Sequence, residues 1–144
     1  MNVPKSSVLF LLPSLQGGGA EQVILSLLRH IDREKFRLAL AVVDVRAAIY
    51  REDLPDDVEL IDLHCSRVRQ AMLKIIRLIW KRRPDVVFST LSHFNLAIAV
   101  LRPLLPDGIS YIARETSVVS EVVKGYAHPE WWAWAYRQIG RAHV

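Results

Sequence analysis

Strand-length apolar runs alternate with helix-like segments along this chain, and that alternation restricts the possible folds more than any other feature. Five runs have the length and composition of strands buried on both faces: "SVLFLLPSL", "FRLALAVVD", "VELIDL", "DVVFST" and "ISYIARE". Between them, apolar residues recur at helical spacing in 20–31, from Met72 to Trp80, and in "HFNLAIAVLRPLL", which Pro103 ends or kinks. The pattern predicts an α/β fold: a Rossmann-like parallel sheet with helices on both faces.

The carboxyl ends of the predicted strands are the expected position of a ligand site. Crossovers between parallel strands are right-handed, so all strands of such a sheet end at the same edge. Ligands of open α/β sheets bind outside that edge. The residues that the sequence places there are Ser14–Gly19, Asp44, Ser89–His93 and Arg114–Ser117.

Composition and charge narrow the functional classes. The chain has 144 residues, which suits one domain, and a formal net charge of +4, which is too small to indicate nucleic-acid binding. Its one cysteine, Cys65, cannot form a disulfide within the chain, and the adjacent His64 has no further ligands nearby for a metal site. No stretch of about 18 uncharged apolar residues is present, so a membrane-spanning helix is not expected.

Three consecutive glycines, Gly17 to Gly19, lie between the first strand and the first helix. Glycine lets backbone N–H groups approach a ligand closely, and a helix N-terminus favours an anion. A phosphate loop of the ATPase type is excluded because no Gly-Lys pair follows. A nicotinamide fingerprint needs a third glycine where this chain has Gln22, although Asp44 could bind a ribose, so that interpretation stays as an alternative.

The stretch "LLPSLQGGGAEQVILSLLRHID" resembles the opening of family 4 glycosyltransferases, which carry a G-G-[AS]-E element after the first strand. "PDVVFSTLSHFNLAIAVL" and "YIARETS" resemble the fourth and fifth strand ends of the same domain, and the resemblance extends to about Arg137. It implies the N-terminal, acceptor-side half of a two-domain GT-B fold. It also implies retaining transfer of a sugar from a nucleotide-sugar donor to an acceptor hydroxyl, in polysaccharide or glycolipid synthesis, without a metal cofactor.

The resemblance assigns roles to individual residues. It places donor-phosphate or substrate binding at Gly17, Gly18, Gly19, Ala20, Glu21 and Thr116, and catalysis at His93, Arg114 and Glu115. Structural alternatives stay open for each polar side chain. By the resemblance Glu21 caps the helix start, but it could instead be a plain charge that complements the helix dipole, and His93 could pack locally. Arg114 and Glu115 could form ion pairs that support the loop, Thr116 could cap a helix, and Asp44 could be a solvated loop carboxylate.

Two further segments concern partners and location. The basic helix-like stretch "RVRQAMLKIIRLIWKRRP" predicts either contact with an anionic membrane, with Trp80 at the interface, or a sheet-covering helix with a solvated basic rim. The stretch "EWWAWAYR" could stack on sugars or lipids, or pack against a second domain. The expected location is the cytoplasm, either free or peripherally bound to the inner face of the membrane. Nucleic acid is not expected as a partner.

The last residues, 139–144, read "IGRAHV" and resemble a translated sequencing adapter, so they are predicted to be a non-native tail. Residues 1–138 are then an incomplete N-terminal domain of a glycosyltransferase, and the second domain, which binds most of the donor, is missing. On this interpretation the 144-residue chain is inactive alone. The alternatives are a stand-alone Rossmann-like binding module and an NAD(P)-dependent oxidoreductase.

Overall fold

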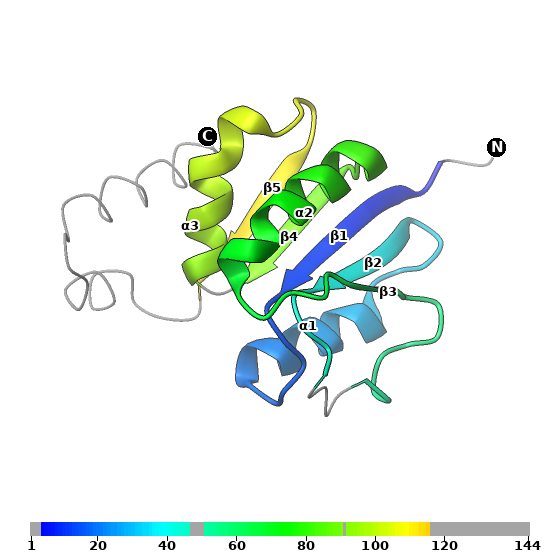
Figure 1. Ribbon diagram of the computed structural model, residues 1–144. Helices are drawn as coiled ribbons and strands as arrows, with labels where there is room; N and C mark the ends of the chain where they lie inside the picture. Colours follow the sequence, from blue (N-terminus) through cyan, green and yellow to red (C-terminus); the bar gives the residue numbers. More distant parts are fainter. Residues whose placement is uncertain (1–3, 47–50, 91, 116–144) are drawn as a thin grey trace.

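A parallel sheet organises the described part of the chain (Figure 1). The computed structural model describes residues 4–46, 51–90 and 92–115. Within them, all strand pairs are parallel and the strand order is β3-β2-β1-β4-β5. The strands are β1 (Ser6–Leu12), β2 (Phe36–Val42), β3 (Glu59–Asp62), β4 (Val86–Thr90) and β5 (Ser110–Arg114). The predicted Rossmann-like α/β fold is confirmed at this level.

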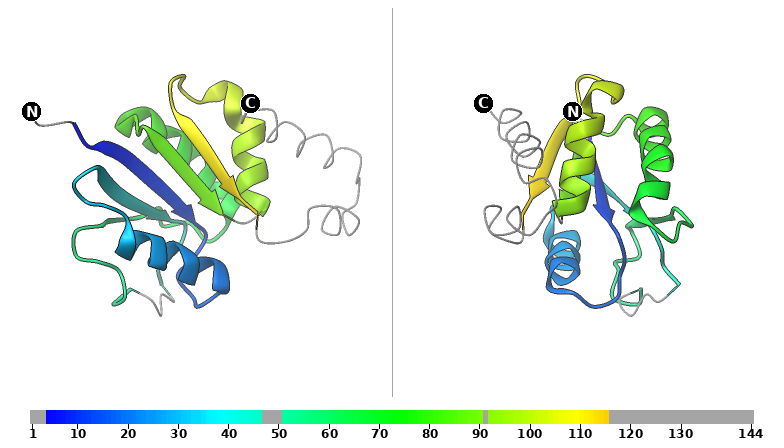
Figure 2. Two further views of the ribbon diagram at one scale, coloured as in Figure 1. Left: turned by 180° about the vertical axis from the view of Figure 1, so that it is seen from behind. Right: turned by 60° about the vertical axis from the view of Figure 1, so that its left-hand side comes forward.

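Helices cover the two faces of the sheet (Figure 2). Helix α1 (Gly19–His30) lies on one face, while α2 (Val68–Arg82) and α3 (Ser92–Leu101) lie on the other. The short 3-10 helix η1 (Arg102–Leu104) follows α3 and contains Pro103. Proline has no N–H for the helical ladder, so α3 ends before it, as predicted.

Two apolar cores lie on opposite sides of the strands. Phe10 and Leu40 point toward α1 and pack with Ile24, whereas Leu11 and Ala41 point the other way, into a core with α2 and α3. Successive side chains of a strand alternate between faces, so β1 and β2 contribute to both cores. This explains why their sequences are almost continuously apolar.

Pro13 sets the end of the first strand. The apolar run suggested a strand through Leu15, but β1 ends at Leu12. A proline cannot donate a hydrogen bond to the neighbouring strand, so pairing stops before it. Leu15 is nevertheless fully buried, in the core beneath α1.

The strand order contains one reversal of direction. From β1 the chain moves outward to β2 and β3, and α2 then carries it back to β4, on the other side of β1. The chain therefore leaves β1 and β4 toward opposite faces of the sheet. In open α/β sheets, the crevice for a ligand opens at such a reversal, outside the carboxyl ends of the two strands.

Several predictions fall outside the part of the chain that the structure describes. These are the substrate-binding role of Thr116, the packing of the Trp-rich segment and the non-native tail at 139–144. Among the described residues, no helix is long and apolar enough to cross a membrane.

Candidate functional site

The glycine turn lies at the reversal between β1 and β4. Gly17 has φ 114°, a conformation that other residues rarely adopt. Gly18 is the N-cap, with extended backbone angles of −79° and 160°, and α1 begins at Gly19. The turn thus brings the amino end of a 12-residue helix to the carboxyl edge of the sheet.

The three glycines differ in what a side chain would meet. A Cβ atom at Gly18 would lie 2.4 Å from Glu21 Oε2, so this position has to lack a side chain while Glu21 keeps its orientation. A Cβ atom at Gly19 would meet nothing within 4 Å. Gly17 has to be glycine because of its positive φ, and Gly18 because a Cβ atom there would clash with the Glu21 carboxylate. Neither reason applies to Gly19. The space beside Gly19 is therefore open at the switch point.

Glu21 folds back over the start of α1. Its carboxylate accepts hydrogen bonds from the Gly18 N–H and from Ser14 Oγ, the latter at 2.8 Å, and the residue is buried. The prediction that Glu21 caps the helix start is confirmed; whether it also contacts a substrate stays a prediction. Because Glu21 occupies the Gly18 N–H, the N–H groups available to a ligand are those further into the first turn, which lack partners within the helix.

A buried amide joins β4, α3 and β5. Asn95 is 1% exposed, and its Oδ1 accepts a hydrogen bond from Ser89 Oγ at 2.7 Å. Its Nδ2 donates to the Arg114 carbonyl oxygen at 2.9 Å and to Glu115 Oε1 at 2.6 Å. The Asn95 side chain therefore fixes the backbone at the end of β5 and the carboxylate that follows it. Sequence reasoning missed Asn95; the available signal was a single amide within the apolar stretch "HFNLAIAVL".

Thr90 and Arg114 lie next to each other at the same edge of the sheet. They are register partners on β4 and β5, so their side chains lie on the same face. Phe88, two residues before Thr90, packs with the core beneath α1, which identifies that face as the α1 side. Both Thr90 Oγ1 and Arg114 Nη1 are out of contact with solvent, and neither has a hydrogen-bond partner among the described residues. Unsatisfied buried donors of this kind are rare and call for an explanation.

The remaining predicted site residues are placed as follows. The backbone of His93 lies in the first turn of α3, next to the end of β4, but its side chain is outside the description. Arg114 is the last residue of β5 and Glu115 follows it, at the predicted edge. The structure thus joins the ends of β4 and β5 through Asn95. The glycine turn follows β1, which is the neighbour of β4 in the sheet.

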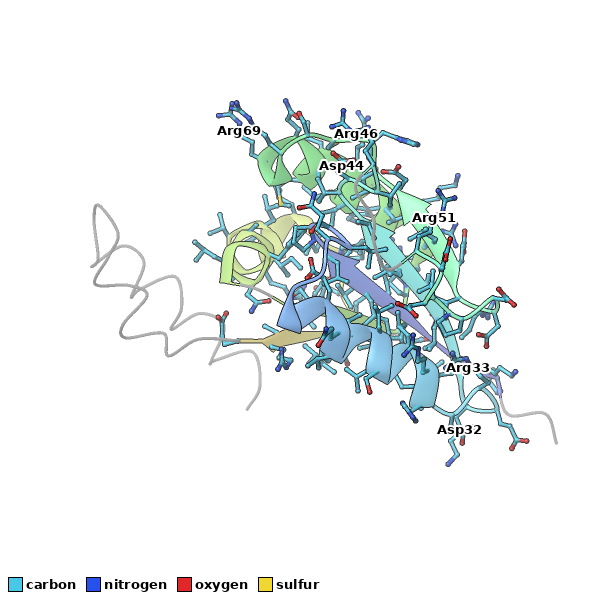
Figure 3. The ribbon with its side chains drawn as sticks, turned by 90° about the horizontal axis from the view of Figure 1, so that it is seen from below. Asp32, Arg33, Asp44, Arg46, Arg51 and Arg69 are labelled. Atoms are coloured by element: carbon cyan, nitrogen blue, oxygen red, sulfur yellow. The ribbon has the colours of Figure 1, made fainter. Side chains whose placement is uncertain are left out.

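Asp44 lies beyond the end of β2 and is engaged by a neighbouring arginine (Figure 3). Arg46 Nη2 donates to Asp44 Oδ2 at 2.7 Å, and Arg46 Nε donates to both carboxylate oxygens at 3.0 Å. The side-chain and backbone hydrogen bonds from Arg46 lower the pKa of Asp44 to about 2. Both carboxylate oxygens that a ribose would need already accept hydrogen bonds from Arg46.

The basic helix α2 covers the sheet. Its residues Ala71, Ile75 and Ile79 are buried against the strands. Trp80 is partly exposed, but its Nε1 donates to the Leu104 carbonyl oxygen at 2.9 Å and the Arg83 guanidinium lies 4.4 Å above its ring. These contacts match the interpretation of α2 as a sheet-covering helix with a basic rim. Contact of α2 with a membrane stays a prediction.

Comparison with known proteins adds no family to this description: no family model matches the chain, and no curated protein matches it significantly. Within the described ranges, no group of three or more His, Cys, Asp and Glu residues could hold a metal ion. The candidate site therefore consists of the glycine turn, the Asn95 network and the pair Thr90–Arg114, all at the carboxyl edge of a Rossmann-like sheet.

Proposed function

We propose that this chain is the N-terminal, acceptor-side half of a retaining GT-B glycosyltransferase. The full enzyme transfers a sugar from a nucleotide-sugar donor to an acceptor hydroxyl. The observation that carries the proposal is the open space beside Gly19 at the reversal between β1 and β4. At the same edge of the sheet, on the α1 face, lie Thr90 Oγ1 at the end of β4 and Arg114 Nη1 at the end of β5, both buried and without a partner among the described residues. The sequence resemblance around "GGGAE" supplies the reaction class.

Two groups at this edge suit a diphosphate leaving group: the N–H groups in the first turn of α1 and the Arg114 guanidinium. In the proposed front-face substitution, the acceptor oxygen forms a bond to the anomeric carbon on the face from which the diphosphate departs. The bond between that carbon and the diphosphate oxygen breaks, and the proton of the acceptor hydroxyl passes to the departing diphosphate oxygen. Negative charge then grows on the departing phosphate oxygen. The N–H groups in the first turn of α1 and the Arg114 guanidinium stabilise that charge, and fixed donors of this kind need no reorganisation during the reaction. Closure of the second domain over this edge completes the site.

Asn95 has a positioning role in this proposal. It holds Glu115 Oε1 at 2.6 Å and the Arg114 carbonyl oxygen at 2.9 Å, so it orients the last residue of β5 and the residue that follows it. Its own hydrogen-bonding groups are satisfied by these contacts and by Ser89. A ligand is therefore expected to contact Arg114 and Glu115 and not Asn95 itself.

The nicotinamide-dependent alternative is less well supported. The third glycine of its fingerprint is replaced by Gln22, and the Asp44 carboxylate is already bound by Arg46. A stand-alone binding module is the other alternative. Thermal shift of the 144-residue chain separates these cases, because stabilisation by NADH supports the oxidoreductase. The glycosyltransferase proposal predicts no stabilisation by NADH and little by UDP- or GDP-sugars without the second domain.

The decisive experiment is to read the coding DNA beyond codon 138 and to assay the complete product. The proposal expects the frame to continue into a second Rossmann-like domain with an acidic E-x7-E-like motif. It also expects the complete protein to release UDP or GDP from a nucleotide sugar when an acceptor is present. A frame that stops at codon 144 in the genome, or sugar transfer by the 144-residue chain alone, would contradict the proposal.

A further inference from the structure

One half of the α1 side of the sheet has no covering element among the described residues. Helix α1 packs on β1 and β2, and its core reaches only as far as Val86 and Phe88 on β4, which are half-buried. On β5 the register partner of Phe88 is Ile112, which is 42% exposed. The opposite face of the same strands is covered by α2 and α3, with Val87 buried and Tyr111 packed against that core. The strip formed by Val86, Phe88 and Ile112 is called the β4–β5 strip below.

An uncovered strip of this kind is unusual in a parallel sheet, because parallel strands are normally buried on both faces. β5 is also an edge strand, with one side of its backbone unpaired within the described residues. Exposed edge strands are normally covered or blunted, since they otherwise pair with other chains. The exposed apolar face indicates that something packs on the β4–β5 strip, and the open edge of β5 leaves room beside it.

We propose that the segment Trp131–Tyr136 of this same chain packs on the β4–β5 strip. The segment carries three tryptophans and one tyrosine, and each such ring covers roughly 150–250 Å² of apolar surface on burial. Trp131, Trp134 and Ala135 have the spacing of one helical face. Large apolar rings therefore match an apolar strip that no described helix covers.

The chain length between the two parts permits this contact. The chain leaves β5 at Arg114, at the end of the strip, and residues 115–130 connect it to Trp131. An extended chain spans at most about 3.3–3.6 Å per residue, so this connection reaches every point of a five-residue strand. The short connection also gives the segment an effective concentration in the millimolar range, which favours it over a second copy of the chain at ordinary concentrations.

Cysteine cross-linking tests the contact directly. In a Cys65→Ser background, Ile112→Cys is combined in turn with Trp131→Cys, Trp132→Cys and Trp134→Cys. The matched control replaces Ile112→Cys by Leu73→Cys, because Leu73 is also apolar and exposed, at 67%, but lies on α2 across the sheet. We expect at least one Ile112 pair to form a disulfide within the monomer at least fivefold faster than its Leu73 counterpart, and to lose this advantage in urea. Equal rates, or mainly disulfide-linked dimers, would overturn the proposal.

Tryptophan fluorescence gives a second, independent measurement. In a Trp80→Phe background, all remaining tryptophans lie in the proposed segment. Ile112→Asp is expected to shift their emission to longer wavelength and to increase iodide quenching about twofold, while Leu73→Asp changes neither. Unchanged emission and quenching in Ile112→Asp, with the β-sheet signal in circular dichroism preserved, would show that the segment does not pack on the strip. If Ile112→Asp prevents folding, the milder cysteine pairs decide the question.

Discussion

The Glu21 carboxylate accepts a hydrogen bond from the N–H of Gly18, three residues earlier, and so closes the start of α1. The same carboxylate accepts a hydrogen bond from Ser14 Oγ at 2.8 Å, which ties the glycine turn to the helix. One buried side chain therefore determines the shape of the turn at the candidate site.

Glu21→Ala is expected to lower the free energy of unfolding by about 1–2 kcal/mol, because it removes a helix-start cap and leaves Ser14 without its acceptor. Urea unfolding at pH 7 measures the change. Glu21→Gln keeps an acceptor for the Gly18 N–H, so its free energy of unfolding should fall by less than half as much as that of Glu21→Ala. Equal stability of Glu21→Ala and the wild type would show that the cap contributes nothing.

Substitutions at Gly17 and Gly19 are expected to have different effects. Gly17→Ala forces a Cβ atom into a backbone conformation with φ 114° and should cost about 1–2 kcal/mol of stability. Gly19→Ala meets no atom within 4 Å and should leave the melting temperature unchanged or slightly raised. In a complete, active enzyme, Gly19→Ala should reduce kcat/KM at least tenfold if the open space holds the donor. Unchanged kcat/KM would remove Gly19 from the site.

Thr90 and Ser89 are adjacent residues with opposite predictions. Thr90→Val replaces a buried hydroxyl that has no described partner, so it should leave stability unchanged or raise it by about 1 kcal/mol. Ser89→Ala removes a hydrogen bond to Asn95 and should lower stability by about 1 kcal/mol. Thermal and urea unfolding of the two variants test this contrast. A loss of more than 1 kcal/mol in Thr90→Val would reveal a partner for its hydroxyl.

Asn95→Ala is expected to cost about 2–4 kcal/mol, because it removes a buried amide and leaves Ser89 and the end of β5 without their partner. Ser66→Ala is a suitable control: it removes an exposed hydrogen bond, to Gln70, and should change stability by less than about 0.5 kcal/mol. Chemical denaturation of both variants measures the difference. Similar small effects would indicate that the Asn95 network adds little.

The ion pair of Asp44 and Arg46 predicts a pH effect. The pKa of Asp44 is lowered to about 2 by the hydrogen bonds from Arg46, so its contribution to stability is present above the ordinary value near 4 and is lost as the pH falls toward 2. Carboxyl ¹³C NMR should show this low pKa, and Arg46→Ala should return it to near 4. Arg29→Ala removes a separate ion pair, with Asp53, and should leave the pKa of Asp44 unchanged. A normal pKa in the wild type would contradict the pairing.

Local sequence patterns were sufficient to predict the elements. The five apolar runs, the helix after the glycines and the end of α3 before Pro103 all follow from burial, periodicity and the missing proline N–H, which act within a few residues. The cap at Glu21 was also predicted, but from the resemblance around "GGGAE" and not from a local pattern. The strand run past Pro13 was predicted too long, because apolar character alone does not distinguish a strand residue from a buried loop residue such as Leu15.

The sequence by itself thus determined the fold class, the glycine turn and its helix cap. Only the tertiary structure decided that β4 pairs with β1, that Asn95 holds the end of β5, and that Thr90 Oγ1 and Arg114 Nη1 lie on one face without a partner among the described residues. It also revealed the β4–β5 strip, which no described element covers. The physical reason is the range of the interactions: periodicity and capping join residues one or two turns apart, whereas strand order and buried polar contacts join residues far apart in the chain.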